Sequence, residues 1–223
     1  AAGLQPRTAV GNPYGDGYYD DFNTAVGLDS AGRTQLHHKG KLVIGVENTP
    51  TVIFDLMQFL VIDLGGVVGQ IGMGQHGTAF AHAGMRMGPA ICYEGLYGDF
   101  YGDFVRRGAQ FMAIISNDGW WGDTPGYKHL FTISRLRAIE HRRAIARSAN
   151  TGMSGFISAR GDIGETLGWE KRGVISAAVP LNSELTFYTR YGDYLGRIAE
   201  YLTLLCVLYY IAYRVKRENY LVK

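Results

Sequence analysis

The hydrophobic and polar positions between residues 85 and 180 alternate between short apolar runs and longer amphipathic stretches. The runs that predict β-strands are residues 85–92, 111–116, 144–149, 153–158 and 174–179. Amphipathic stretches over about 97–107 and 127–143 predict helices. The positions expected to face the core in the longer helix are Leu130, Ile133, Leu136 and Ile139. Strands separated by helices indicate a mixed α/β sandwich.

Turn residues between apolar runs predict two hairpins. Residues 23–28 and 33–38 form the first, joined by the turn sequence Asp-Ser-Ala-Gly at 29–32. The second has its turn at 160–162, where the sequence is Arg-Gly-Asp. Antiparallel hairpins therefore flank the alternating α/β part of the chain.

Three further segments of the first 66 residues lack a clear strand pattern. Residues 1–17 are rich in Gly, Pro and Tyr and predict an irregular loop, whereas residues 39–50 have no periodicity and predict an ordered loop. Residues 52–64 are strongly apolar and are followed by two glycines. This last segment is either a helix packed on the body of the protein or a mobile flap that contacts lipid.

The C-terminal part of the chain has a different character. Residues 198–213 form a stretch of 16 residues in which Glu200 is the only charge. As a helix it is about 24 Å long, against about 30 Å for a hydrocarbon core, and flanking tyrosines can extend the span. Basic residues follow it directly, which favours a membrane helix with a cytoplasmic tail over a buried core helix. We therefore expect a domain at 1–192, a transmembrane helix at 193–213 and a basic tail at 214–223.

Composition limits the classes of function. With 47% hydrophobic and 19% charged residues, the chain has the balance of a folded protein. A formal net charge of +2 argues against a nucleic-acid-binding surface. Two cysteines cannot supply a disulfide framework, and the adjacent His37 and His38 do not form a metal-ligand cluster. We expect a monomer that needs neither a metal nor a cofactor.

A cysteine marks the end of one predicted strand. The run Gly88-Pro-Ala-Ile stops at Cys92, and Glu94 follows two residues later. A cysteine in such a turn is placed to act as a nucleophile, although a buried, inert cysteine is the common alternative. A thiol needs a base to take its proton, and a lysine can stabilise the oxyanion that forms after attack. Lys39 and Glu47 lie at predicted loop positions from which they can supply these groups.

Several motifs together resemble the nitrilase superfamily, and within it the apolipoprotein N-acyltransferase family. The motifs are His-Lys-Gly-Lys-Leu-Val at 38–43, Glu47 and Pro50, Ile-Cys-Tyr-Glu at 91–94, Ser-Asn-Asp-Gly-Trp-Trp-Gly-Asp at 116–123, Arg-Leu-Arg-Ala-Ile-Glu at 135–140, and Arg-Ser-Ala-Asn-Thr-Gly at 147–152. The resemblance extends over nearly the whole chain from about residue 18. It implies an α-β-β-α sandwich followed by one C-terminal transmembrane helix.

The resemblance assigns roles to residues of the expected active site. Members of the family use a Glu–Lys–Cys triad, so Lys39 matches the triad lysine and Cys92 the acyl-carrying nucleophile. Glu47 and Glu94 match two further carboxylates, and Tyr93 matches an aromatic residue beside the triad. The alternative for the two glutamates is a structural ion pair with Lys39.

Three other residues near these motifs have two interpretations each. By resemblance, Trp120 and Trp121 line the acyl-binding site, and the alternative is packing in the core. Lys41 competes with Lys39 for the role of triad lysine, and we expect it instead to be a solvated loop charge.

One part of the family pattern is missing. The triad glutamate should precede Lys39, yet residues 1–46 contain no glutamate. The acidic residues there are Asp16, Asp20, Asp21 and Asp29, none in a matching segment. We expect the triad glutamate to lie upstream of residue 1 in a longer protein, so that the present piece alone is inactive.

By resemblance, the chain belongs to an enzyme of the bacterial inner membrane whose catalytic domain faces the periplasm. Such enzymes transfer an acyl chain from a phospholipid, through a cysteine thioester, to the N-terminal amine of a diacylglyceryl-cysteine lipoprotein. Two other functions stay open: an amidase of the nitrilase type that hydrolyses small amides, and a catalytically inactive domain that serves as a binding module.

Overall fold

The computed structural model describes residues 2–6, 19–43, 47 and 71–221 of the chain. Its larger sheet has six strands in the order β4-β5-β6-β7-β8-β9, of which β5, β6 and β7 run parallel. The bounds are Phe80–His82 for β4, Met85–Ile91 for β5, Phe111–Ser116 for β6, Ile145–Ala149 for β7, Ser154–Ile157 for β8 and Ile163–Leu167 for β9. This sheet confirms the predicted mixed α/β class.

The smaller sheet consists of β1 (Ala2–Pro6), β2 (Tyr19–Leu28) and β3 (Thr34–His38), all antiparallel. The hairpin of β2 and β3 was predicted, and its turn is closed by backbone hydrogen bonds between Asp29 and both Gly32 and Arg33. The prediction of an irregular loop is wrong for residues 2–6. Those residues lack an alternating pattern, and their strand arises from backbone pairing with β2.

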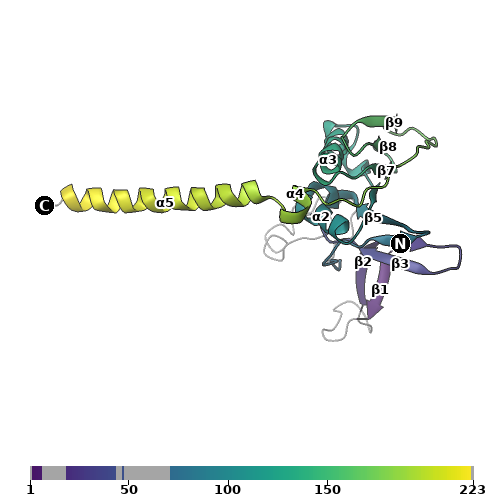
Figure 1. Cartoon of the computed structure of the whole chain (residues 1–223), viewed down its shortest axis with the longest axis horizontal. Helices are drawn as coiled ribbons and strands as arrows, with labels where there is room; N and C mark the ends of the chain where they lie inside the picture. Colours follow the sequence, from purple (N-terminus) through teal and green to yellow (C-terminus); the bar gives the residue numbers. More distant parts are fainter. Residues whose placement is uncertain (1, 7–18, 44–46, 48–70, 222–223) are drawn as a thin grey trace, which may run out of the picture.

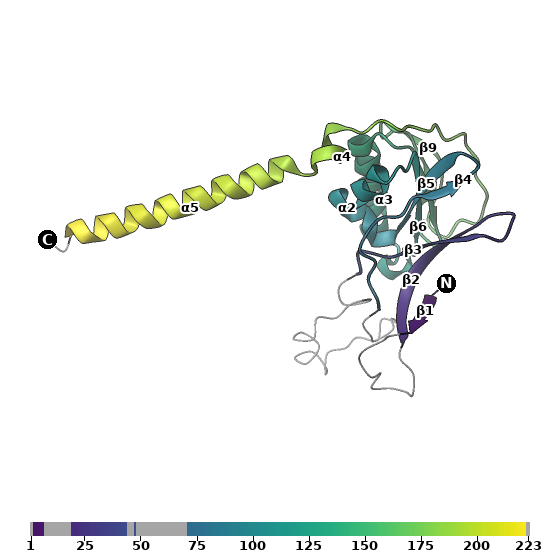
Figure 2. The same ribbon diagram turned by 60° about the horizontal axis from the view of Figure 1, so that its bottom comes forward.

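Two helices cover one face of the larger sheet. Helices α2 (Gly98–Arg106) and α3 (Pro125–His141) lie side by side against it (Figures 1 and 2). Both were predicted to within two residues at each end. The core between helices and sheet contains Ala90, Tyr101, Phe104, Val105, Ala109, Met112, Ile114, Phe131, Ala138, Ile145 and Ile157.

The buried face of α3 differs from the predicted stripe. Leu130 is buried, but Leu136 and Ile139 are 46% and 40% exposed. A spacing of three residues falls about 60° short of a full helical turn, so the stripe rotates away from the sheet. The residues that face inward are Tyr127, Leu130, Phe131, Ser134, Arg137, Ala138 and His141, which follow the 3.6-residue period. Three of them are polar, so the hydrophobic pattern of the sequence did not identify this face.

The strand predicted at 174–179 is also wrong. These residues form no strand, and Val174 is 94% exposed. The hairpin turn at 160–162 is correct, but the strand that follows it is β9, which pairs with β8 immediately after the turn. Residues 7–18, 44–46 and 48–70 lie outside the described part, including the apolar segment 52–64.

After α4 (Phe187–Tyr191), one long helix, α5 (Tyr194–Leu221), projects away from the domain (Figures 1 and 2). Its segment Tyr194–Arg214 has a mean hydropathy of 1.4 and is long and apolar enough to cross a membrane. None of the apolar window is buried, so α5 is not a core helix.

Candidate active site

Cys92 occupies a sharp turn at the end of β5. It directly follows Ile91 and begins a short 3₁₀ helix, η1 (Cys92–Leu96). Its φ angle of 45° lies in the left-handed region, which is unfavourable for a residue with a side chain. Such conformations persist where the surrounding structure enforces them, and they cluster at functional sites. The thiol is half-buried and forms no disulfide.

Glu94 holds this turn in place. Its carboxylate accepts hydrogen bonds from the backbone N–H of Ile91 and of Gly40, both at 2.6 Å. His37 Nε2 lies 3.1 Å from each of the same oxygens. Glu94 is fully buried, so it fastens the nucleophile turn to the loop after β3. It does not form the alternative ion pair with Lys39.

Glu47 does form that ion pair. Lys39 Nζ donates to Glu47 Oε1 at 2.9 Å and Oε2 at 2.7 Å, and Lys39 is almost completely buried. Glu47 also accepts from the Val43 N–H and the Asn23 side-chain amide. Burial alone would raise the pKa of Glu47, but these hydrogen bonds and the Lys39 charge lower it on balance. Glu47 is therefore ionised at neutral pH.

A cavity of about 550 Å³ brings most of the predicted residues together. Its lining residues are Asn23, Lys39, Val43, Glu47, Ile91, Cys92, Tyr93, Ile115, Ser116, Asn117, Trp120, Trp121, Leu130 and Asn150. Six of the seven site residues predicted from the sequence line it, and Glu94 lies behind the cavity wall. The walls are mostly apolar, and the Lys39–Glu47 ion pair and Cys92 border the same space.

The two tryptophans lie on the short helix η2 (Gly119–Trp121) after β6. They are 49% and 44% exposed, so they do not pack in the core. The loop beneath them is fixed by Asp118, whose buried carboxylate receives two hydrogen bonds from Arg147 at 3.0 and 2.8 Å. The large aromatic rings are thus presented to the cavity from a rigid base.

Sequence reasoning missed two supports of this site. Asn23 binds Glu47 through its side chain and accepts the Lys39 backbone N–H through its carbonyl oxygen. Asparagine is uncommon in strands, so its place inside predicted strand 23–28 was a usable signal. The Asp118–Arg147 pair joins residues 29 positions apart, and no local pattern indicates it.

The arrangement suits nucleophilic acyl chemistry. An ammonium has three N–H donors, and two of those on Lys39 bind Glu47. The third is not used by any described residue. A thiol and a fixed cation thus border the same apolar space, as attack on a carbonyl carbon requires.

Residues 1–185 match the carbon–nitrogen hydrolase family. The chain is 36% identical over 181 residues to an apolipoprotein N-acyltransferase of Chlorobaculum tepidum, covering 78% of this chain and 34% of the relative. It is 34% identical over 183 residues to an apolipoprotein N-acyltransferase of Verminephrobacter eiseniae, covering 78% and 33%. The chain thus spans about a third of the length of these curated relatives.

Solved structures show the same fold. Nit3 of Saccharomyces cerevisiae, a member of the nitrilase superfamily, matches with a TM-score of 0.51 and 18% identity, covering 69% of this chain and 51% of that protein. An amidase from Nesterenkonia matches with a TM-score of 0.50 and 15% identity, covering 78% and 59%. The predicted nitrilase-like fold is confirmed. Its curated relatives include apolipoprotein N-acyltransferases. Because the family match extends over residues 1–185, the chain belongs to the carbon–nitrogen hydrolase family.

Proposed function

We propose that this chain carries the catalytic site of an N-acyltransferase, which moves an acyl chain from a phospholipid to the amine of a diacylglyceryl-cysteine lipoprotein. The observation that carries the proposal is the shared cavity of Cys92, Lys39 and Glu47, whose walls are mostly apolar. The exposed apolar helix α5 adds a second argument, because it would hold the domain beside its lipid substrates.

In the first half-reaction, the Cys92 thiolate attacks the ester carbonyl of the phospholipid. The third N–H of Lys39 stabilises the oxyanion of the tetrahedral intermediate. When the intermediate collapses, the ester C–O bond breaks and a thioester forms on Sγ. The thiol proton passes through a general base to the departing lysophospholipid alkoxide.

In the second half-reaction, the neutral α-amine of the lipoprotein attacks the thioester carbonyl. The C–S bond breaks, an amide forms, and the proton lost by the amine returns to the Cys92 thiolate. Lys39 acts on the oxyanion again. An apolar cavity favours this outcome over hydrolysis because it limits the access of water.

The general base is proposed to be a carboxylate outside the described residues. Glu47 borders the cavity, but its ion pair with Lys39 and its lowered pKa make it a weak base. Its role is to orient Lys39, as the hydrogen bonds at 2.7 and 2.9 Å indicate. A glutamate from elsewhere in the complete protein fits the family pattern.

We also propose that α5 spans the bacterial inner membrane. Arg214, Lys216 and Arg217 follow its apolar part, and basic residues favour the cytoplasmic side. The catalytic domain then lies on the periplasmic side, where lipoprotein N-termini are accessible. Cysteine accessibility labelling of residues placed at both ends of α5 would test this orientation.

The function is tested with the protein expressed in membranes from its complete reading frame. It is incubated with a phospholipid whose acyl chain carries an alkyne, and the labelled peptides are identified by mass spectrometry. We expect a hydroxylamine-labile acyl group on Cys92, lost in Cys92→Ala and kept in the matched control Cys206→Ala. Label on another residue, or unchanged acyl transfer in Cys92→Ala, would overturn the proposal.

A further inference from the structure

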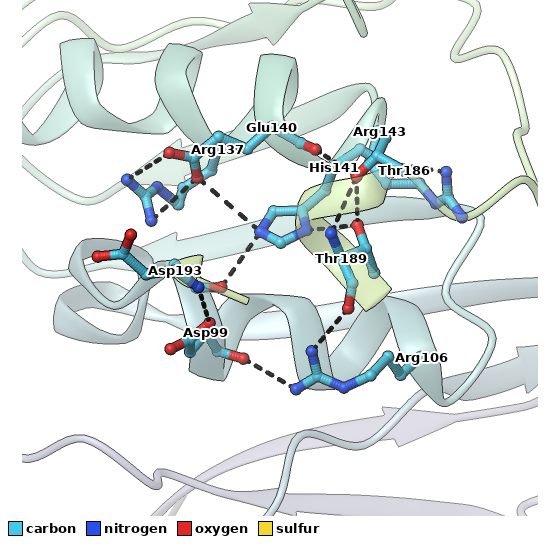
Figure 3. Close-up of polar contacts among 10 residues, drawn as sticks. Asp99, Arg106, Arg137, Glu140, His141, Arg143, Thr186, Thr189 and Asp193 are labelled. Atoms are coloured by element: carbon cyan, nitrogen blue, oxygen red, sulfur yellow. Dashed lines mark hydrogen bonds and ion pairs between the residues drawn. The ribbon is translucent and has the colours of Figure 1, made fainter. Parts of the chain in front are cut away.

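A second cavity, of about 340 Å³, is lined in part by Lys41, two residues after Lys39 of the active-site cavity. Its lining residues are Lys41, Gln75, His76, Tyr97, Asp99, Phe100, Asp103 and Arg106. It is on the side of the domain where α5 begins, since Asp99 accepts a hydrogen bond from the backbone N–H of Asp193, just before that helix (Figure 3). A site at this position faces the interfacial region if α5 enters a membrane.

Lys41 is the available cation of this cavity. Its Nζ lies 5.3 Å from the ring centroids of both Tyr97 and Phe100. It has no hydrogen bond or ion pair with any residue in the part of the chain that the structure describes. Lys41 is half-buried and is held by two ring faces, which corrects the expectation of a solvated loop charge. None of its three N–H donors is used by a described residue.

The other charged groups of the cavity are already engaged. Arg106 donates to the carbonyl oxygens of Thr189 and Asp99, as Figure 3 shows. Asp103 accepts from the Gly77 N–H and from Arg107. His76 Nδ1 lies 3.7 Å from Asp103 Oδ2. Lys41 is thus the cation of the cavity that has no hydrogen bond or ion pair with a described residue.

Some of the residues that line the two cavities lie close to one another. Lys39 borders the first and Lys41 the second, so their Cα atoms are at most about 7 Å apart. Tyr93 of the first cavity and Tyr97 of the second have ring centroids 5.6 Å apart. In a glycerophospholipid, only the glycerol backbone separates the phosphate from the acyl esters.

We propose that Lys41 binds the headgroup phosphate of the acyl donor while its ester carbonyl lies at Cys92. This inference rests on the proposed function and assigns the lipid phosphodiester to the second cavity. The ring faces of Tyr97 and Phe100 keep the ammonium in place, and the acyl chain extends into the cavity lined by Trp120 and Trp121.

The test compares two acyl donors in the membrane-embedded protein. One is a diacyl phospholipid, and the other is an activated ester of the same acyl chain without phosphate. Acylation of Cys92 is followed in the wild type, Lys41→Ala, Lys41→Arg and the control Lys128→Ala. Lys128 is a suitable control because it also lies over a ring, that of Tyr127 at 5.6 Å, but lines neither cavity.

We expect Lys41→Ala to raise the KM for the phospholipid about tenfold, the loss of one charge-assisted contact to phosphate. The reaction with the phosphate-free ester should be unchanged, Lys41→Arg should retain most of the affinity, and Lys128→Ala should behave as wild type. Equal losses with both donors, or no loss with either, would overturn the headgroup assignment.

Two further outcomes distinguish headgroup binding from failure of the proposed function and from binding of free phosphate. If the wild type acylates Cys92 from neither donor, the proposed function itself fails, and the inference fails with it. If inorganic phosphate changes the reaction of the phosphate-free ester in the wild type but not in Lys41→Ala, while Lys41→Ala leaves the KM for the phospholipid unchanged, the site binds free phosphate, and the lipid assignment is wrong.

Discussion

Two buried polar regions of the molecule use similar residues in opposite ways. In the active-site cavity, Lys39 and Glu47 form an ion pair that borders the same open space as Cys92. Between α2, α3 and α4, His141 is enclosed: its Nδ1 is 2.8 Å from the Thr189 hydroxyl and its Nε2 is 3.1 Å from the Gly98 carbonyl oxygen (Figure 3). We call this second region the α4 polar cluster.

The electrostatic behaviour of the two regions differs accordingly. Burial, followed by the positive charge of Arg137, lowers the pKa of His141 to about 3, so its ring is neutral. Burial also raises the pKa of Glu140, whereas the pKa of Glu47 is lowered. The α4 polar cluster suppresses charge and fixes the start of α5 on the domain. In the active site, Glu47 keeps its charge at the wall of an open cavity.

The largest expected effect comes from the nucleophile. Cys92→Ala should reduce acyl transfer by about 10⁴-fold, since no other described residue of the cavity lining carries a thiol. Its unfolding temperature should match that of the wild type, because the thiol makes no hydrogen bond with the described residues. Differential scanning calorimetry and a transfer assay on the same samples check both statements. A large fall in unfolding temperature would mean that the cysteine has a structural role.

The second-largest effect is expected from substitution of Lys39. Lys39→Met should reduce the rate of Cys92 acylation by roughly 10²- to 10³-fold, the usual effect of removing one oxyanion donor. The variant keeps the length of the side chain but leaves Glu47 without its partner. Single-turnover acylation measures the rate, and Lys128→Met is the matched control. A rate within threefold of the wild type would remove Lys39 from the mechanism.

The α4 polar cluster should control the stability of the domain as a function of pH. Between pH 6.5 and about 3, the unfolded chain binds a proton at His141 that the folded protein does not. Stability should therefore fall as the pH is lowered below 6.5, by up to about 1.4 kcal/mol per pH unit, and be fully present above it.

His141→Gln should remove this part of the pH dependence, measured by urea unfolding at pH 5.0, 6.0 and 7.5. His129→Gln, an exposed position on the same helix, is the control and should keep the slope. Equal slopes in His141→Gln and wild type would show that the ring is not held neutral. Acylation of Cys92 at pH 7.5 should change little in either variant that remains folded.

The smallest effect is expected at the cavity wall. Trp120→Ala should raise the KM for long-chain donors roughly tenfold, because it removes apolar contact with the chain. Donors with a short acyl chain should be unaffected. Trp169, which packs on Tyr127 outside the cavity, provides the control variant Trp169→Ala. A uniform effect on all donors would instead place Trp120 among the residues that support the fold.

Local patterns predicted the part of the fold that is built from local contacts. The hairpin of β2 and β3 has a turn sequence and alternation of its own, and the apolar run that ends at Cys92 is a strand. The buried face of α3 could not be read from the sequence, because it contains charged and polar residues. His141 is buried through hydrogen bonds to Gly98 and Thr189, which are distant in sequence, and Arg137 is buried while paired with Glu140 of the same helix. Burial of these residues is decided by tertiary structure rather than by hydrophobicity.

The candidate site was predicted from residue types at motif positions, and the structure places six of its seven residues on one cavity. The separate position of Glu94 could not be foreseen, because it depends on the backbone amides of Gly40 and Ile91. Lys41 was undervalued for a similar reason: Tyr97 and Phe100 approach it only in the folded chain.

The most direct test of the central claim follows the acyl group itself. Protein carrying a labelled acyl chain on Cys92 is freed of excess phospholipid and mixed with a synthetic diacylglyceryl-cysteine peptide. If Cys92 is the acyl carrier, we expect the label to leave Cys92 and to appear as an amide on the peptide amine at the same rate. Loss of label as free fatty acid, at a rate independent of the peptide, would contradict acyl transfer and indicate hydrolysis.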